Sequence, residues 1–230
     1  MKGEHHPDIP KNQNVYLSDN DGFLMQINIQ TLAERDRYKL MIGAVVPRPI
    51  AWVSTMDAAG NLNVAPFSFF NAVCSNPMTL LFCVGVADTP DGKKDTLRNI
   101  EAVPEFVINT TNEETATAMN LTATPLPPTQ SEFQWAGLTP APSSTIRVPR
   151  VAEAPIAFEC KLQRIITVND QPGGGTVIFG EVQCVHVRDD LYANGRILLE
   201  PYKPIGRLGG DSYVRVTNTF DMARIPAPKA

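Results

Sequence analysis

Two adjacent lysines, Lys93 and Lys94, directly precede a segment that the sequence predicts to be a short helix ending at Ile100. Asp95 or Thr96 would cap that helix, because either side chain can accept a hydrogen bond from a free backbone N–H group. A helix N-terminus carries partial positive charge, so this arrangement attracts phosphate. On these residues alone, a solvated lysine turn is the simpler interpretation.

A second group of polar residues lies within 47–71, PRPIAWVSTMDAAGNLNVAPFSFFN. This segment predicts a hairpin, with a strand over 50–56, a turn over 58–61 and a second strand that ends at Pro66. Small hydroxyl and amide side chains alternate there with aromatic rings, which suits a flat and partly polar ring as ligand. The polar residues are Ser54, Thr55, Asn63, Ser68 and Asn71, and the aromatic ones are Trp52, Phe67, Phe69 and Phe70.

Five blocks of the chain resemble, in the same order, the FMN-binding split-barrel proteins of the flavin reductase-like group. That group includes flavoredoxins and the flavin reductase partners of two-component monooxygenases. The blocks are RPIAWVST at 48–55, NVAPFSFFN at 63–71, KKDTLRNI at 93–100, GEVQCVHVRDD at 180–190 and PIGRLGGDSYVR at 204–215. The resemblance predicts the fold and the cofactor more strongly than the reaction, because one fold can serve several activities.

The resemblance implies FMN as cofactor, which requires a phosphate site, a slot for the ring and donors near the ring edge where reduction adds negative charge. Lys94 and Thr96 are expected at the phosphate, and Arg48, stiffened by two prolines, is expected at the phosphate or the ring edge. The expected cofactor-binding residues are Arg48, Pro49, Trp52, Ser54, Thr55, Asn63, Pro66, Phe67, Ser68, Asn71, Lys94, Asp95, Thr96, Arg207 and Tyr213.

His186 is the candidate catalytic residue. It lies near the end of a predicted strand, on the same face as Cys184, and such a histidine is more often structural. The resemblance implies a histidine close to the flavin and the nicotinamide, which favours a catalytic role. The four cysteines form no CxxC pair and the three histidines are scattered, so we expect reduced thiols and no metal site.

The order of predicted elements, mainly strands with a few short helices, favours a Greek-key or split antiparallel β-barrel over a doubly wound sheet. We expect an N-terminal tail or edge segment over 1–30, the barrel over 31–217 and a C-terminal tail over 218–230. The proline-rich segment 125–155 is either a lid or a surface crossover that packs Trp135.

Three further strands and two helices are predicted. An apolar run over 78–84 predicts a strand at the centre of the sheet. The segment 156–168 changes its apolar phase at Arg164, which predicts a strand with a bulge. Its antiparallel partner is expected at 176–188, across a hairpin loop that contains Gly173 to Gly175. Helices are expected over 32–42 and 112–121.

The composition excludes several partners. The 230 residues carry a net charge of −4 without long runs of one sign, which argues against nucleic acid and against an anionic membrane surface. No segment approaches the roughly 20 apolar residues of a membrane span, and the first residues lack the apolar core of a signal peptide. We therefore expect a cytoplasmic location and a small-molecule substrate.

The predicted function is that of a homodimeric FMN oxidoreductase, an NAD(P)H-dependent flavin reductase that supplies reduced flavin to a partner such as a monooxygenase. NAD(P)H is expected to bind transiently, because the chain has no GxGxxG motif. Two alternatives stay open. The protein could be a flavoredoxin-like carrier that exchanges electrons with another protein, or an FMN enzyme that acts directly on an organic substrate beneath the 125–155 segment.

Overall fold

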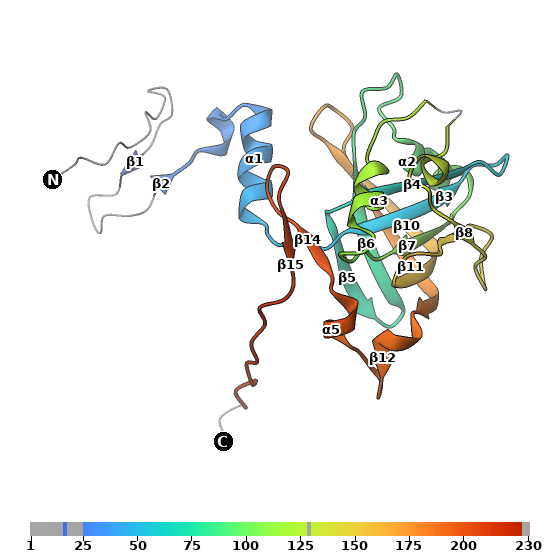
Figure 1. Cartoon of the computed structure of the whole chain (residues 1–230). Helices are drawn as coiled ribbons and strands as arrows, with labels where there is room; N and C mark the ends of the chain where they lie inside the picture. The colour runs from blue at the N-terminus through green and yellow to red at the C-terminus, as the bar shows by residue number, and fades with distance from the viewer. Residues whose placement is uncertain (1–15, 18–24, 128–129, 227–230) are drawn as a thin grey trace.

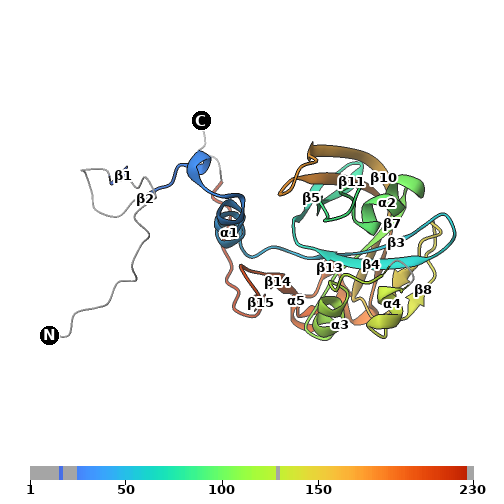
Figure 2. The same cartoon turned by 90° about the horizontal axis from the view of Figure 1, so that it is seen from above.

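A seven-stranded antiparallel sheet, ordered β4-β3-β7-β10-β11-β6-β5, forms the centre of the molecule. The structure is a computed structural model that describes residues 16–17, 25–127 and 130–226. The sheet curls into a barrel (Figures 1 and 2), which confirms the predicted fold class. Its strands are β3 (Ala51–Met56), β4 (Leu62–Phe67), β5 (Phe70–Ser75), β6 (Met78–Gly85), β7 (Glu105–Asn109), β10 (Ile156–Asn169) and β11 (Gly175–Val187).

The predicted hairpins are present, with one correction to the strand order. β3 and β4 pair across the expected turn, where Gly60 has a φ of 93°. β10 and β11 pair across residues 170–174, and their register shifts between Leu162 and Arg164, which confirms the predicted bulge. β6 was expected at the centre of the sheet, but it lies next to the edge strand β5, and β10 is central instead. A long apolar run predicts burial and does not specify position in the sheet.

Strand β3 is buried on both faces and separates two cores. Ala51 and Val53 point into the barrel with Phe82 and Ile108. The alternate residues belong to an outer core in which Trp52 packs with Phe133. Side chains of a strand alternate between its faces, so one apolar strand serves both cores.

Close approach of the backbone at Gly180 in β11 tightens the barrel. A Cβ atom there would lie 2.5 Å from the Phe106 ring and 3.0 Å from Cys160 Cβ. Glycine therefore lets β11 pass directly over the aromatic core.

Short helices and strands surround the barrel. The helices are α1 (Glu34–Ala44), α2 (Asp95–Ala102), α3 (Ala116–Leu121), α4 (Glu132–Trp135) and α5 (Leu199–Tyr202), with 3₁₀ turns at Ile29–Thr31 and Asp189–Leu191. The two-residue strands are β1 (Tyr16–Leu17), β2 (Met25–Gln26), β8 (Pro140–Ala141), β9 (Arg150–Val151), β12 (Tyr192–Ala193) and β13 (Arg196–Ile197). β14 (Ile205–Arg207) pairs with β15 (Tyr213–Arg215), and this hairpin stands beside α1 in Figure 1.

Two helices begin later or differently than predicted. The expected helix over 112–121 is only α3, because Asn112 Oδ1 accepts the amide hydrogen of Thr115 and forms a turn in place of the first helical residues. The N-cap of α2 is Lys94, and it makes no side-chain capping bond, whereas Asp95 or Thr96 was expected in that role. The amides at the start of α2 are therefore left without a side-chain cap.

The 125–155 segment is anchored by Phe133 and Leu138 and not by Trp135. Trp135 is 54% exposed, whereas Phe133 and Leu138 are buried against the outer face of β3 and β4. The segment thus covers the sheet, and its first residues also border the cavity described below.

In the described part of the chain, no helix has the length and apolar character needed to cross a bilayer. The His5-His6 pair lies outside the described residues.

Candidate functional site

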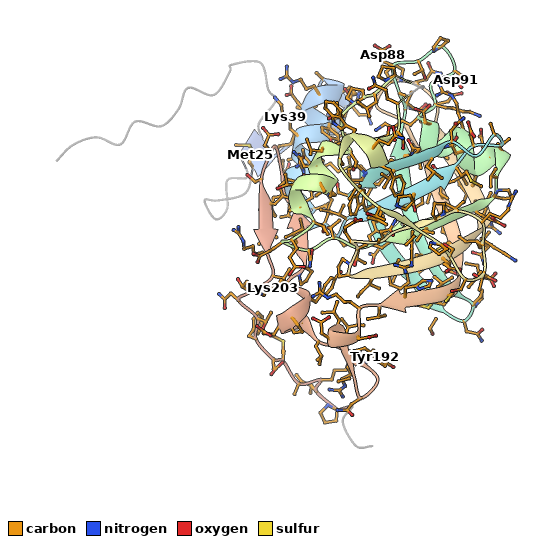
Figure 3. All side chains as sticks on the ribbon, turned by 45° about the vertical axis from the view of Figure 1, so that its right-hand side comes forward. Met25, Lys39, Asp88, Asp91, Tyr192 and Lys203 are labelled. Carbon is orange, nitrogen blue, oxygen red and sulfur yellow. The ribbon has the colours of Figure 1, made fainter. Side chains whose placement is uncertain are left out.

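The start of α2 and the end of β4 border a cavity of about 520 Å³, hereafter the α2 cavity. Its lining combines polar groups from Asn63, Lys94 and Thr96 with the apolar walls of Pro66 and Phe67. The preceding loop closes one side, and its labelled residues Asp88 and Asp91 mark this end of the barrel in Figure 3. The sequence blocks around 63–68 and 93–96 therefore meet at one site.

A buried amide and two threonines form the floor of the α2 cavity. Asn63 Nδ2 donates to Thr55 Oγ1 at 3.2 Å and to Thr96 Oγ1 at 3.1 Å. Asn99 Nδ2 also donates to Thr55, at 3.1 Å. Thr96 is 1% exposed, and within residues 25–127 and 130–226 its hydroxyl hydrogen has no acceptor. A buried donor at a cavity wall favours a ligand oxygen as its partner.

Lys94 differs from the lysine beside it in having no carboxylate partner among the described residues. Lys93 Nζ lies 2.7 Å from Glu101 Oε2. Lys94 Nζ instead lies 5.8 Å from the centre of the Phe67 ring, over the cavity. The exposed ammonium, the uncapped start of α2 and the Thr96 hydroxyl form a donor set that fits a phosphate dianion.

Three carboxylates near this donor set are either bound by an arginine or shifted toward the protonated form by burial. Arg98 donates to Asp91 and to Asp95, and its hydrogen bonds keep the pKa of Asp91 well below its usual value. Glu132 reaches the cavity from α4, and burial raises the pKa of its carboxyl group. These arrangements limit the repulsion that an anionic ligand would meet.

A wider cavity of about 900 Å³, hereafter the hairpin cavity, adjoins the first and shares Pro66, Phe67 and Lys94 with it. Its other walls come from α1, through Tyr38 and Met41, from β6 and from the loop between β10 and β11. These walls are largely apolar, and burial raises the pKa of the Cys83 thiol there. The shape suits a flat aromatic ring next to the phosphate site.

Sequence reasoning missed most of the hairpin cavity. Glu34 and Tyr38 were assigned only to a connecting helix, and Gly173 only to a turn. Gly173 has a φ of 81°, and a Cβ there would lie 2.7 Å from Glu34 Cγ, so helix and loop touch at this glycine. The contact joins segments about 140 residues apart in the sequence, and no local sequence pattern predicts such a contact.

Seven of the expected cofactor-binding residues line these two cavities: Asn63, Pro66, Phe67, Ser68, Lys94, Asp95 and Thr96. Several others lie beneath or behind them. Trp52 is fully buried and donates to Thr122 Oγ1 at 2.9 Å, and Ser54 donates to the Pro149 carbonyl at 2.7 Å. Pro49 and Asn71 are exposed and line neither cavity.

Arg48 is buried, and all three of its guanidinium nitrogens are occupied by protein acceptors. Nη1 donates to the carbonyls of Ile42 and Val45 at 2.7 Å each, Nη2 to the carbonyl of Leu208 at 2.9 Å, and Nε to Ser68 Oγ at 3.3 Å. Arg48 thus fastens the end of α1 and the β14–β15 hairpin to the barrel.

Arg207 and Tyr213 also lie outside the two cavities. The Arg207 guanidinium stacks on the Tyr213 ring, 4.5 Å from its centre, and donates to the Gly210 carbonyl. The Tyr213 hydroxyl donates to Asn120 Oδ1 at 3.3 Å. Within one chain, this pair stabilises the β14–β15 hairpin.

His186 belongs to a different part of the barrel from Lys94. Its Nε2 atom lies 2.5 Å from Oε1 of Glu159, a carboxylate that is 0% exposed. Burial opposes ionisation of Glu159, but hydrogen bonds from Thr145, Ser144 and His186 hold its pKa at about 2. His186 lines neither the α2 cavity nor the hairpin cavity, so a role in hydride transfer stays a prediction.

An antiparallel barrel with a phosphate-compatible donor set beside an apolar slot for a ring defines a flavin-binding class of protein. Comparison with known proteins agrees with that class. The family model described as "Flavin reductase like domain" matches residues 42–200. The chain therefore belongs to the flavin reductase-like family, and it is a flavin oxidoreductase.

Solved structures support the assignment. Nitrilotriacetate monooxygenase component B from Bacillus cereus is 39% identical, with a TM-score of 0.83 over 88% of this chain and 100% of that chain. The 2-nitrobenzoate 2-nitroreductase of Pseudomonas fluorescens is 35% identical, with a TM-score of 0.78 over 88% and 96%. A protein with a split barrel domain from Shewanella frigidimarina, 24% identical with a TM-score of 0.72 over 87% and 96%, shows the same fold.

Proposed function

We propose that this protein is an NAD(P)H-dependent flavin reductase that binds FMN with its phosphate at the start of α2. The observation that carries the proposal is the donor set of Lys94 and Thr96. These donors have no acceptor in the described protein, and they adjoin a slot for a ring. FMN is favoured over FAD because the α2 cavity offers one donor set suited to a phosphate group.

When bound, FMN supplies the capacity to accept a hydride and to pass electrons onward. The chain's own residues bind and orient it. Lys94 and Thr96 hold the phosphate, and Phe67 and Pro66 fix the ring plane at the junction of the two cavities. The raised pKa of Cys83 keeps its thiol neutral, so no thiolate opposes the negative charge that a flavin gains on reduction. The remaining width of the hairpin cavity admits a transiently bound nicotinamide.

A homodimer is the proposed assembly. The second half of β10 is exposed on both faces, although β10 is the central strand of the sheet. Ile166 and Val168 there are 42% and 74% exposed, and Val73 on the edge strand β5 is 46% exposed. A second copy related by a two-fold axis would cover this apolar surface.

The partner proposed for the reduced flavin is a separate oxygenase, since a 39% identical structure is a monooxygenase component B. A second candidate function is direct reduction of a small organic substrate, favoured by the 35% identical nitroreductase and by the width of the hairpin cavity. For either function we propose a cytoplasmic location, where NAD(P)H is available and the four cysteines, none of them in a disulfide, would stay reduced.

Anaerobic stopped-flow mixing of the FMN-loaded protein with NADH or NADPH tests the reductase assignment. We expect rapid loss of flavin absorbance with at least one nucleotide, and mass spectrometry of the released cofactor should give FMN. If neither nucleotide reduces the flavin, the reductase assignment fails and a carrier fed by another protein takes its place. Reoxidation of the reduced protein by a nitroaromatic compound faster than by free FMN would favour the second candidate.

A further inference from the structure

Strands β10 and β11 bring a carboxylate, a thiol and an imidazole together outside the two cavities described above. These groups belong to Glu159, Cys184 and His186, and one ligand atom from each lies within 4.8 Å of the other two. We propose that this cluster binds a thiophilic divalent transition-metal ion of the Zn²⁺ type. Nothing in this inference depends on the proposed flavin chemistry.

The pairing of the two strands places the three side chains on one face. Glu159 is the direct partner of Cys184, and His186 is paired with Ala157, two residues before Glu159. Cys184 and His186 are also two residues apart, so both side chains leave the same face of β11. The register changes after Glu159, so the cluster lies beside a bulge, where strand geometry departs from the regular ladder.

The ligand set selects a particular class of metal. A thiolate, an imidazole and a carboxylate are the three kinds of side chain that bind Zn²⁺ in proteins. Ca²⁺ and Mg²⁺ take oxygen ligands almost exclusively, so a site with sulfur and nitrogen disfavours them. An ionised Cys184 and Glu159 would together carry two negative charges, which a divalent cation balances in this partly buried position.

Glu159 already has the supporting contacts that a metal ligand needs. Its carboxylate is 0% exposed and accepts the Ser144 amide at 2.5 Å and the Thr145 amide at 2.7 Å. The Thr145 hydroxyl adds a third bond, at 2.5 Å. Outer contacts of this kind orient a ligand before the metal arrives.

Metal binding requires a small rearrangement of the two more exposed side chains. The Glu159–His186 contact of 2.5 Å is a hydrogen bond, whereas ligand atoms around Zn²⁺ stand about 3–4 Å apart, given bonds of about 2.0–2.3 Å. His186 is 26% exposed and Cys184 is half-buried, so both can move. The ion would take the place of the hydrogen in that bond, and the thiol would lose its proton as the metal–sulfur bond forms.

His186, one of the three groups, borders open space away from the proposed flavin site. His186 lines a separate cavity of about 520 Å³ with Arg188 and Asp189, so water can complete the coordination. In Figure 3, Tyr192, just beyond this segment, lies at the opposite end of the barrel from Asp88 and Asp91. Metal binding and flavin binding can therefore be measured independently.

The test uses the full-length, flavin-loaded protein without an affinity tag, stripped with a chelator and titrated with Co²⁺ in thiol-free buffer. Tetrahedral Co²⁺ absorbs in the red, where oxidised flavin does not. We expect one equivalent to bind and Zn²⁺ to displace it. Cys184→Ser and His186→Gln should each weaken binding by more than the roughly 100-fold that loss of an outer contact can cost.

Two matched controls separate this cluster from other thiols and histidines. Cys74→Ser removes an exposed thiol on β5, and His5→Ala combined with His6→Ala removes the N-terminal histidine pair. Both controls should bind Co²⁺ as the wild type does. A missing Co²⁺ signal, a signal that survives Cys184→Ser, or one lost in the histidine control would overturn the proposal.

A second measurement keeps the proposal falsifiable if the site variants fold poorly. X-ray absorption at the zinc edge of wild-type protein loaded with one equivalent of Zn²⁺ should show one sulfur ligand and otherwise nitrogen and oxygen. A shell made only of nitrogen and oxygen would show that Cys184 is not a ligand, and the cluster would then be a hydrogen-bonded pair beside an unrelated thiol.

Discussion

Lys94 and Arg48 are both cations within sequence blocks expected to bind the cofactor, yet the structure gives them different environments. Lys94 is exposed at the start of α2, has no acceptor among the described residues and overlooks a cavity. Arg48 is 5% exposed, and protein oxygens accept from each of its guanidinium nitrogens. The difference shows that a cation in a ligand-binding motif is available to a ligand only if its donors are free.

The same distinction applies to the hydroxyl groups. The Thr96 hydroxyl accepts a hydrogen bond from Asn63 and has no acceptor for its own hydrogen in the described protein. The Ser54 hydroxyl, in contrast, donates to the Pro149 carbonyl. Free donors therefore mark the groups that we propose to bind the cofactor, and occupied donors mark the groups that stabilise the barrel. Four substitutions test this separation, and their expected effects decrease in turn.

Arg48→Ala should have the largest effect, and the effect should be on folding. It leaves the buried carbonyl of Ile42 and the partly buried carbonyls of Val45 and Leu208 without their donor, at about 1 kcal/mol each. We expect a loss of at least about 3 kcal/mol in the free energy of unfolding, or a fall of roughly 6–12 °C in Tm. Calorimetry with the cofactor removed measures this. Arg48→Lys should recover only part of the loss, because one ammonium replaces three donor nitrogens. A stable Arg48→Ala protein that cannot bind FMN would reverse the assignment of Arg48.

Lys94→Ala should leave Tm nearly unchanged and weaken FMN binding. A charge-assisted hydrogen bond contributes about 1.5–3 kcal/mol, which corresponds to roughly 10- to 150-fold in Kd. Riboflavin, which lacks the phosphate, should bind the variant and the wild type about equally. Lys93→Ala is the matched control, because Lys93 is paired with Glu101. Equal losses for FMN and riboflavin would place Lys94 at another part of the ligand.

Thr96→Val should weaken FMN binding by roughly 10-fold, the lower end of the range for a bond to a charged group. The substitution keeps the side-chain shape and removes the hydroxyl, that is, the hydrogen that has no acceptor in the described protein and the oxygen that accepts from Asn63. Thr96→Ser should restore most of the affinity. An unaltered Kd in the valine variant would indicate that the phosphate does not reach Thr96.

Glu132→Gln should have the smallest effect, and that effect should depend on pH. Burial raises the Glu132 pKa above its usual 4.5, so the fold favours the protonated form, and stability falls as pH rises through the folded-state pKa. Glutamine keeps the shape without the charge. The Tm difference between variant and wild type should therefore grow from pH 4 to pH 8. A difference that is constant with pH would mean that Glu132 does not ionise in this range.

The barrel strands were predictable because their signals are local, whereas the assignment of phosphate to the start of α2 came from the family resemblance and stays a prediction. A turn signal between β-branched and aromatic residues gave the β3–β4 hairpin, apolar alternation gave β10, and the phase change at Arg164 marked the bulge. Lys94 and Thr96 stand at a helix start that the sequence itself indicates. Arg48 could not be assigned correctly to a structural role, because its acceptors include a carbonyl 160 residues away.

Distant contacts also explain the other omissions. The cluster of Glu159, Cys184 and His186 was not predicted, because Cys184 and His186 share a face by simple alternation but Glu159 joins them only through the register across an irregular hairpin. Packing of the Trp135 side chain was expected in a surface crossover, but Trp135 is exposed and Phe133 faces the sheet. Phe133 and Trp135 are two positions apart in α4, so their side chains leave different faces of this four-residue helix and only one of them meets the sheet.

A crystal structure of the protein with bound FMN would test the contrast between Lys94 and Arg48 most directly. The account predicts phosphate oxygens about 3 Å from Lys94 Nζ and from Thr96 Oγ1, with the ring against Phe67 and the bonds of Arg48 to Ile42, Val45 and Leu208 unchanged. A phosphate bound instead by Arg48 or Arg207, with those backbone contacts broken, would contradict it.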